Sequence, residues 1–186
     1  MQRRSLLAAT GAALALPAIS PAPISRAWAA GSSKVLRYVP AADIAALDPV
    51  WTTASQTRDH AFLVYDTLYG LDGSLQPQPQ MVAGHVVEDE GRLWRMTLRD
   101  GLRFHDGEKV LARDCVASIR RWAARDSFGQ TLMAVTEEVA APDDRTITFR
   151  LKRPFPQLPA ALAKYSSPTC VIMPERLAKT DPYTAV

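Results

Sequence analysis

The sequence lacks the residue groupings that most enzyme active sites need. Its three histidines, His60, His85 and His105, match no metal-binding spacing such as H-E-x-x-H. The nine glycines form no phosphate-binding loop, and no serine lies in a G-x-S-x-G context. Neither Cys115 nor Cys170 belongs to a C-x-x-C pair. We therefore expect no enzymatic activity, no catalytic residue, no metal and no cofactor.

Acidic residues are absent from the first 29 residues. This stretch begins with Arg3-Arg4, continues with Ser5-Leu6-Leu7 and an Ala/Leu-rich run, and ends with Ala27-Trp28-Ala29, a small-x-small cleavage pattern. The apolar run is too short to span a bilayer core of about 30 Å. Residues 1–29 are therefore predicted to be a cleaved export signal. The paired arginines favour the twin-arginine type, with a general secretory signal as the alternative.

The chain also lacks a charge excess once that signal is set aside. The 186 residues carry 22 basic and 19 acidic side chains. Arg3, Arg4 and Arg26 fall in the signal, so residues 30–186 hold 19 of each sign. A basic surface for nucleic acid is not expected. The local cluster of Arg120, Arg121 and Arg125 is interpreted as the solvated end of a helix, where cations suit the helix dipole.

The segment Leu98–Trp122 is the most informative part of the remaining chain. Two Asp-Gly turns, Asp100-Gly101 and Asp106-Gly107, enclose a short strand and precede a helix predicted over Ala112–Ala124. Apolar residues at i, i+3, i+4 and i+7 spacing predict its buried face: Ala112, Cys115, Val116, Ile119, Trp122 and Ala123. The opposite, wet face is predicted to hold Arg113, Asp114, Ser118, Arg120 and Arg121.

Periodicity predicts the other elements. Ser55, or Thr53, is expected to cap a helix that continues through Tyr69, and a short helix is expected around Ala160–Lys164. His85–Glu88 and Leu93–Leu98 are expected to pair as a hairpin, with Trp94, Met96 and Leu98 buried. Further strands are expected at Val35–Val39, Leu102–Phe104, Thr146–Leu151 and Thr169–Met173. Their sum is an α/β fold without alternating parallel βα units.

Several short motifs, taken in order, resemble one protein family. They are Leu47-Asp48-Pro49, the run Val64–Tyr69 followed by Leu71-Asp72-Gly73, the strand Trp94–Arg99, the segment Leu98–Trp122, and Thr148–Leu151 followed later by Met173-Pro174. This order resembles the extracytoplasmic solute-binding proteins of ABC importers, family 5, the peptide/nickel/opine-binding type. Pro-Gln-Met-Val-Ala at Pro79–Ala83 departs mildly from the family's Pro-x-Leu-Ala.

The resemblance implies a periplasmic-binding-protein-like, type II fold. Residues 30–186 would form the N-terminal portion of that domain, a partial first lobe with an accessory subdomain. The family is several hundred residues longer, so we expect the chain to be truncated, with the second lobe absent. Because affinity in such proteins comes from enclosing the solute between two lobes, residues 30–186 alone are expected to bind solute poorly.

The resemblance also implies which loops of the chain would contact a solute. The matching loops are Val50–Ser55, Phe128–Thr131 and Tyr165–Thr169. The candidate ligand-binding residues in them are Thr52, Thr53, Phe128, Gln130 and Ser167. Apart from Phe128, these residues carry uncharged hydroxyl or amide groups, at places where some relatives have Tyr, Trp or Arg. This departure weakens a nickel-complex interpretation and suits a peptide backbone, a sugar or another polar small molecule.

The expected function is that of an ABC importer's substrate-binding component. It would capture peptides or similar polar solutes in the periplasm and deliver them to a membrane permease with its ATPase subunits. The alternatives are a sensor or chaperone on the same fold, or a non-functional truncated fragment. The sequence leaves open whether Cys115 and Cys170 form a disulfide, which an exported protein permits, or remain buried thiols.

The paired arginines give a direct test of the export route. Replacing both Arg3 and Arg4 by lysine should block export to the periplasm, since the twin-arginine pathway reads that pair. Cell fractionation of the variant and of the unaltered protein measures this. Unchanged export of the double variant would contradict the twin-arginine prediction and favour the general secretory route.

Overall fold

A computed structural model describes residues 37–186. The predicted export signal lies outside the described residues, as do the first two residues of the predicted strand Val35–Val39. The remaining three residues of that strand, 37–39, are not in a strand. That part of the prediction is wrong, because no other strand among residues 37–186 pairs with the segment. Within the same described part of the chain, no helix is long and apolar enough to cross a membrane.

A four-stranded antiparallel sheet organises the fold. Its order is β3 (Val82–Glu88), β4 (Leu93–Leu98), β6 (Thr146–Leu151) and β5 (Thr136–Ala140). Trp94 lies opposite Phe149, and Met96 opposite Ile147. These side chains alternate with exposed ones along β4, so one sheet face is buried and the other is wet. The predicted hairpin and the predicted strand Thr146–Leu151 are both confirmed.

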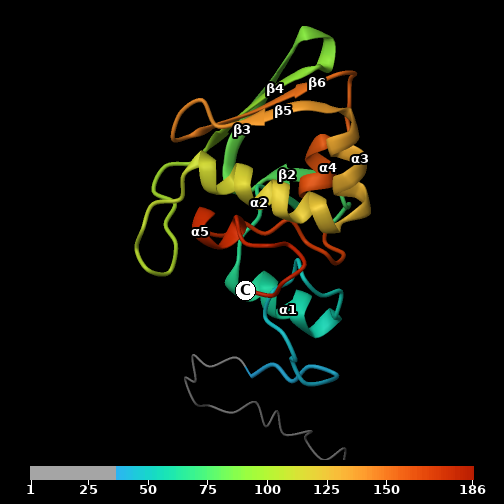
Figure 1. Ribbon diagram of the computed structural model, residues 1–186, viewed down its shortest axis with the longest axis vertical. Coiled ribbons are helices and arrows are strands. Elements are labelled where there is room, and N and C mark those ends of the chain that lie inside the picture. The colour runs from blue at the N-terminus through green and yellow to red at the C-terminus, as the bar shows by residue number, and fades with distance from the viewer. Residues whose placement is uncertain (1–36) are drawn as a thin grey trace, which may run out of the picture. The chain divides into compact units, whose positions relative to one another are not determined.

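Helix α2 (Ala112–Arg125) packs beneath the buried face of this sheet (Figure 1). Its start is fixed by the Asp114 carboxylate, which accepts a hydrogen bond from the backbone N–H of Leu111 at 2.8 Å. The predicted buried face is confirmed, since all of its members are less than a tenth exposed: Ala112, Cys115, Val116, Ile119, Trp122 and Ala123. They join the sheet residues in one hydrophobic cluster.

The prediction that the opposite face of α2 is exposed to solvent is largely wrong. Arg113 and Arg120 are exposed, but Asp114, Ser118 and Arg121 are buried. The C-terminal segment, residues 173–186, covers this second face. The Ser118 hydroxyl hydrogen-bonds the backbone of Met173, and the Asp114 carboxylate accepts a hydrogen bond from the backbone N–H of Glu175 at 2.8 Å. Helix α2 is therefore buried on two sides. A smaller apolar cluster lies on this second side, formed by Val50, Ala61, Ala117, Val171, Met173 and Ala178.

Seven further elements complete the described fold. They are α1 (Ser55–Val64), the hairpin β1 (Tyr69–Leu71) and β2 (Pro77–Pro79), the 3₁₀ turn η1 (Asp89–Gly91), α3 (Ser127–Val135), α4 (Leu158–Leu162) and α5 (Glu175–Ala178). Helices α3 and α4 pack against one another, while α5 lies against α2 on the side away from the sheet (Figure 1).

Four predicted elements need correction. Helix α1 runs from Ser55 to Val64: Ala54 is its N-cap in place of the predicted Ser55 or Thr53, and the helix ends before the predicted Tyr69, which is buried in β1. The segment Thr169–Met173 makes one isolated bridge, Ile172 to Asp66, instead of a strand. Leu102–Phe104 likewise contributes only the Arg103–Lys109 bridge. The short helix predicted at Ala160–Lys164 lies two residues earlier, with Pro159 in its first turn.

A matched pair of neighbouring substitutions tests the phase of α2. Ile119→Asp would place an uncompensated charge in the sheet-facing core, where Ile119 is 0% exposed, and should cost several kcal/mol. Arg120→Asp changes an exposed residue that bonds only the Val139 carbonyl, so it should cost about 1 kcal/mol. Urea unfolding measures both. Equal losses of stability would contradict the assigned helix phase.

Candidate functional site

The three segments predicted to touch solute meet at the C-terminal end of α2. Arg125 donates a hydrogen bond to the carbonyl oxygen of Trp51 at 3.0 Å, which attaches the first segment. Asp126 caps α3, the helix that carries the second segment. Lys164 bonds Asp126 and two carbonyl groups of the third segment. The structure therefore brings the three segments to one region, a placement that the sequence could not supply.

The first segment is shaped by the Leu47-Asp48-Pro49 turn. The buried Asp48 carboxylate accepts hydrogen bonds from the backbone N–H groups of Val50 and Trp51, at 2.9 and 3.3 Å. The Thr52 hydroxyl accepts the N–H of Ala54 at 3.3 Å and so helps to begin α1. Thr52 is half-buried, whereas Thr53 and Trp51 are exposed. Thr53 is thus open to solvent at the start of α1.

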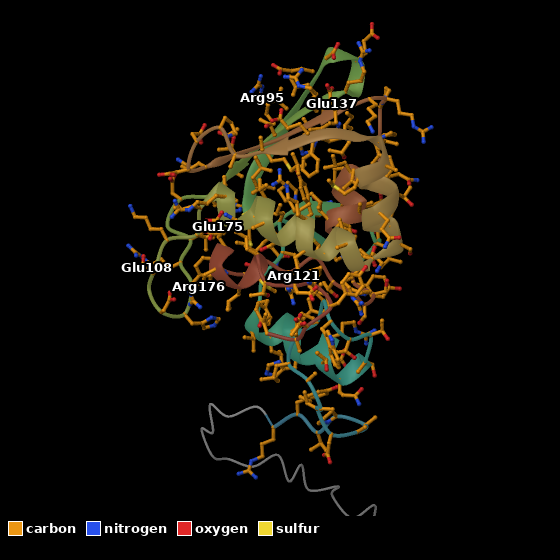
Figure 2. The ribbon with its side chains drawn as sticks, viewed as in Figure 1. Arg95, Glu108, Arg121, Glu137, Glu175 and Arg176 are labelled. Carbon is orange, nitrogen blue, oxygen red and sulfur yellow. The ribbon has the colours of Figure 1, made fainter. Side chains whose placement is uncertain are left out.

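Arg121 fixes this segment to the end of the chain. Its guanidinium donates to Asp48 at 2.8 Å and to the carbonyl oxygens of Thr180, Asp181 and Thr184 at 2.9–3.0 Å. Both side chains of the ion pair are 0% exposed. The interpretation of Arg121 as part of a solvated helix end is therefore wrong: its position at the interface of two segments buries it. Figure 2 places Arg121 inside the fold, whereas the labelled Arg95 lies out along the sheet.

The second segment begins helix α3, where a loop was expected. One Asp126 carboxylate oxygen accepts the N–H groups of Phe128 and Gly129, both at 2.9 Å. Phe128 is half-buried, with its ring edge-on to Phe155 at 6.1 Å between centroids. Gln130 is exposed and donates to the Ala124 carbonyl at 3.2 Å. Phe128 therefore has a packing role, while Gln130 has its amide at the surface.

The third segment is a loop held mainly through its carbonyl groups. Lys164 donates to the carbonyl oxygens of Ser166 and Pro168 at 3.0 and 3.2 Å. The Trp122 indole N–H also donates to the Pro168 carbonyl, at 3.1 Å. Ser167 itself is half-buried. Its loop is thus fixed by neighbours on both sides.

The two buried carboxylates next to these segments are paired. Asp48 is neutralised by Arg121, and Asp126 by Lys164. The Arg125 guanidinium lies over the Tyr183 ring at 4.7 Å from its centroid, a cation–π contact. The region consequently offers hydroxyl, amide and aromatic groups. Arg125, Asp126, Lys164 and Tyr183 were not singled out from the sequence, because their roles depend on partners distant along the chain.

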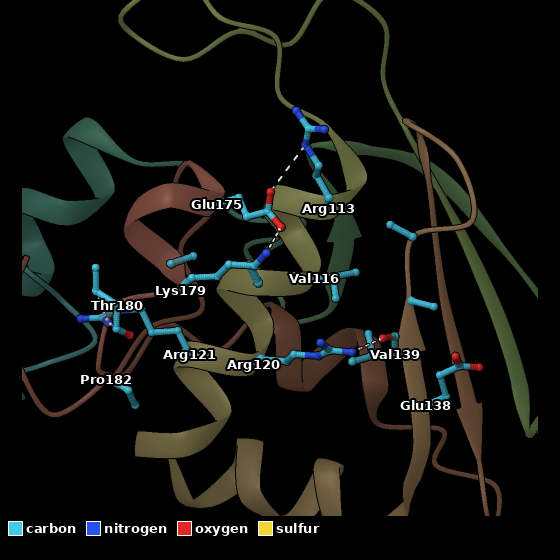
Figure 3. Close-up of a pocket in the computed structure, with 14 residues that line it drawn as sticks. Arg113, Val116, Arg120, Arg121, Glu138, Val139, Glu175, Lys179, Thr180 and Pro182 are labelled. Atoms are coloured by element: carbon cyan, nitrogen blue, oxygen red, sulfur yellow. Dashed lines mark hydrogen bonds and ion pairs between the residues drawn. The ribbon is translucent and has the colours of Figure 1, made fainter.

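A hollow of about 500 Å³ lies elsewhere, between α2, α5 and β5 (Figure 3). Arg113, Glu175 and Lys179 line one side of it, with ion pairs at 3.7 Å for Arg113–Glu175 and 2.7 Å for Lys179–Glu175. None of the five predicted ligand-binding residues lines this hollow. Their role remains a prediction.

The nucleophilic and titratable side chains do not assemble into a reactive group. Cys115 and Cys170 are free and buried, and burial raises the pKa of both thiols, which disfavours the reactive thiolate. His85 hydrogen-bonds the Tyr69 hydroxyl at 2.8 Å and lies against Trp94. Across residues 37–186, no group of three or more His, Cys, Asp and Glu side chains could hold a metal ion.

Comparison with known proteins places this arrangement among solute-binding proteins. Residues 76–184 match the model of the bacterial extracellular solute-binding proteins, family 5 Middle. The chain is similar to a probable peptide ABC transporter periplasmic-binding protein of Sinorhizobium fredii, 43% identical over 155 residues. That match covers 83% of this chain and 28% of the relative. A glutathione-binding protein of Salmonella typhi is 30% identical over 138 residues, covering 72% of this chain and 26% of that protein.

The fold has solved counterparts as well. A periplasmic binding protein of Agrobacterium tumefaciens R10, in complex with agropinic acid, superposes with a TM-score of 0.64 at 23% identity. The match covers 77% of this chain and 30% of that protein. At this identity the likeness concerns the fold, and it agrees with the type II periplasmic-binding-protein prediction. The chain spans under a third of the length of each of these three proteins.

Proposed function

The chain belongs to family 5 of the bacterial extracellular solute-binding proteins, and we propose that it serves an ABC importer by capturing peptides or similar polar solutes in the periplasm. The captured solute would be handed to a membrane permease driven by ATPase subunits. The names of the similar proteins support the peptide class, since one is a probable peptide-binding protein and another a glutathione-binding protein. In this proposal the chain itself catalyses no reaction.

The observation that carries the proposal is the meeting of three segments at the C-terminal end of α2. The carboxylates beside them, Asp48 and Asp126, are already paired, while Arg125 bonds the Trp51 carbonyl and lies over the Tyr183 ring. The proposed solute contacts are neutral hydrogen-bonding groups: the hydroxyls of Thr52, Thr53 and Ser167 and the amide of Gln130. Neutral donors and acceptors suit peptide bonds better than a free carboxylate or a metal complex. Peptide backbone is therefore the preferred substrate chemistry.

Aromatic groups next to these segments are consistent with peptide side chains as a second point of contact. Trp51 is 40% and Tyr183 is 63% exposed, and the Trp51 indole N–H donates to the Tyr183 carbonyl at 3.1 Å. Exposed aromatic rings offer apolar contact area with few rotatable bonds to fix. A solute that combines amide groups with apolar side chains would use both kinds of group.

Calorimetry tests the proposal. The protein expressed from its complete reading frame should bind trialanine or glutathione with a micromolar or lower dissociation constant. Thr52→Ala and Ser167→Ala should each weaken binding by roughly fivefold, the loss of about one neutral hydrogen bond. Thr97→Ala is the matched control, because Thr97 is exposed on the sheet.

Two outcomes would contradict the proposal. The first is the absence of binding by a panel of di- to pentapeptides and neutral polar solutes. The second is binding that Thr52→Ala and Thr97→Ala weaken equally, which would move the site away from the end of α2. Loss of labelled peptide uptake when the gene is deleted from its host would extend the test to the permease.

A further inference from the structure

We propose that Asp126 and Lys164 are positioning residues that set the spacing between the second and third solute-contacting segments. The inference rests on the proposed function, because it assigns these two residues an effect on binding through Gln130 and Ser167. Neither residue is expected to touch the solute. Their role follows from how one lysine is shared between a helix cap and a loop.

Lys164 connects the two segments with a single group. Its ammonium has three hydrogens, and it has three acceptors: the Asp126 carboxylate, the Ser166 carbonyl and the Pro168 carbonyl. The side chain is only 18% exposed. A lysine with all three hydrogens engaged and most of its surface covered has none left for a solute. It therefore acts on binding through the loop that it holds.

Asp126 is the other half of the connection. One carboxylate oxygen accepts the N–H groups at the start of α3, and the other receives Lys164. The side chain is 2% exposed. The same carboxylate thus fixes both the first turn of α3, which carries Gln130, and the lysine that holds the loop carrying Ser167. Moving either partner would change the separation of the two segments.

Both segments also contact α2, and the Lys164–Asp126 pair links them to one another directly. A Cβ atom on Gly129 would lie 2.7 Å from the Cα atom of Ala123, so α3 packs against α2 at close range. The third segment is held against α2 by the bond from Trp122 to the Pro168 carbonyl. Each of these contacts holds one segment on α2, whereas the Lys164–Asp126 pair bonds both segments at once. The pair is therefore the contact whose loss would let the two segments shift relative to one another.

The test compares solute affinity with stability in a set of variants. In the protein expressed from its complete reading frame, Asp126→Asn keeps a helix cap but removes the charge, and Lys164→Met keeps the stem but removes all three donors. Lys152→Met is the matched control, since exposed Lys152 donates a single 3.3 Å bond to the Ala134 carbonyl. Ile119→Val reports loss of core stability alone. Trialanine and glutathione are the probes, titrated well below each melting temperature.

We expect Asp126→Asn and Lys164→Met each to weaken binding about tenfold, with Lys152→Met and Ile119→Val within twofold of the unaltered protein. The double variant Asp126→Asn/Lys164→Met should bind no more weakly than either single one, because both break the same link. It also leaves no unpaired buried charge, so it decides the question if a single variant fails to fold.

The remaining outcomes separate the two proposals. If Gln130→Ala and Ser167→Ala weaken binding while the Asp126 and Lys164 variants do not, the positioning role is refuted and the proposed function stands. An equal loss in Ile119→Val would also refute it, because the effect would then be one of stability. If Gln130→Ala and Ser167→Ala leave binding unchanged, the proposed solute contacts are wrong and the positioning role falls with them.

Discussion

Arg121 joins three parts of the chain that are far apart in sequence. From its place on α2 it bonds Asp48, which shapes the turn before α1, and the carbonyl groups of residues 180–184. The backbone N–H of Val186 also reaches the Asp48 carboxylate, at 3.3 Å. The pair is fully buried, and the two terminal nitrogens of Arg121 donate all of its hydrogen bonds, whereas its buried Nε atom has no partner among the described residues. Other polar contacts from α2 hold the same segments, through Arg125 for the first and Asp114 and Ser118 for the C-terminal one, but of these residues only Arg121 hydrogen-bonds both.

The consequence of this anchor is a helix buried on two sides. The sheet covers one face of α2 with an apolar cluster, and the C-terminal segment covers the other through Asp114, Ser118 and Arg121. Such a helix can organise loops at its end, because its own position is fixed from both directions. The end of α2 is where the segments carrying Thr52, Gln130 and Ser167 meet, held by Arg125, Asp126 and Lys164. The proposed binding region is thus an extension of the packing around one helix.

Much of this fold was predictable from local patterns, and the exceptions share one physical cause. Alternation along Leu93–Leu98 and the 3.6-residue period of α2 identified the sheet core and its helix, because those signals lie in neighbouring residues. Helix α3 was missed, although Asp126 as a cap and the spacing of Leu132 and Val135 could have indicated it. Arg121 and Lys164 were not predictable, because their partners lie 73 and 38 residues away. Polar residues on a helix are interpreted as solvent-exposed unless a distant hydrogen-bonding partner is known. The resemblance to a family named the segments that are proposed to contact solute, but not what holds them together.

The central claim is that the Arg121–Asp48 pair holds the two outer segments on α2, and a double-mutant cycle in urea tests it most directly. Arg121→Met and Asp48→Asn should each lower the free energy of unfolding by about 3–5 kcal/mol, since each leaves a buried charge without its partner. The double variant should lose little more than one single variant, whereas Arg120→Met, its neighbour on the helix, should change stability by about 1 kcal/mol at most. Additive losses from the two single variants, or losses no larger than that of Arg120→Met, would contradict the account.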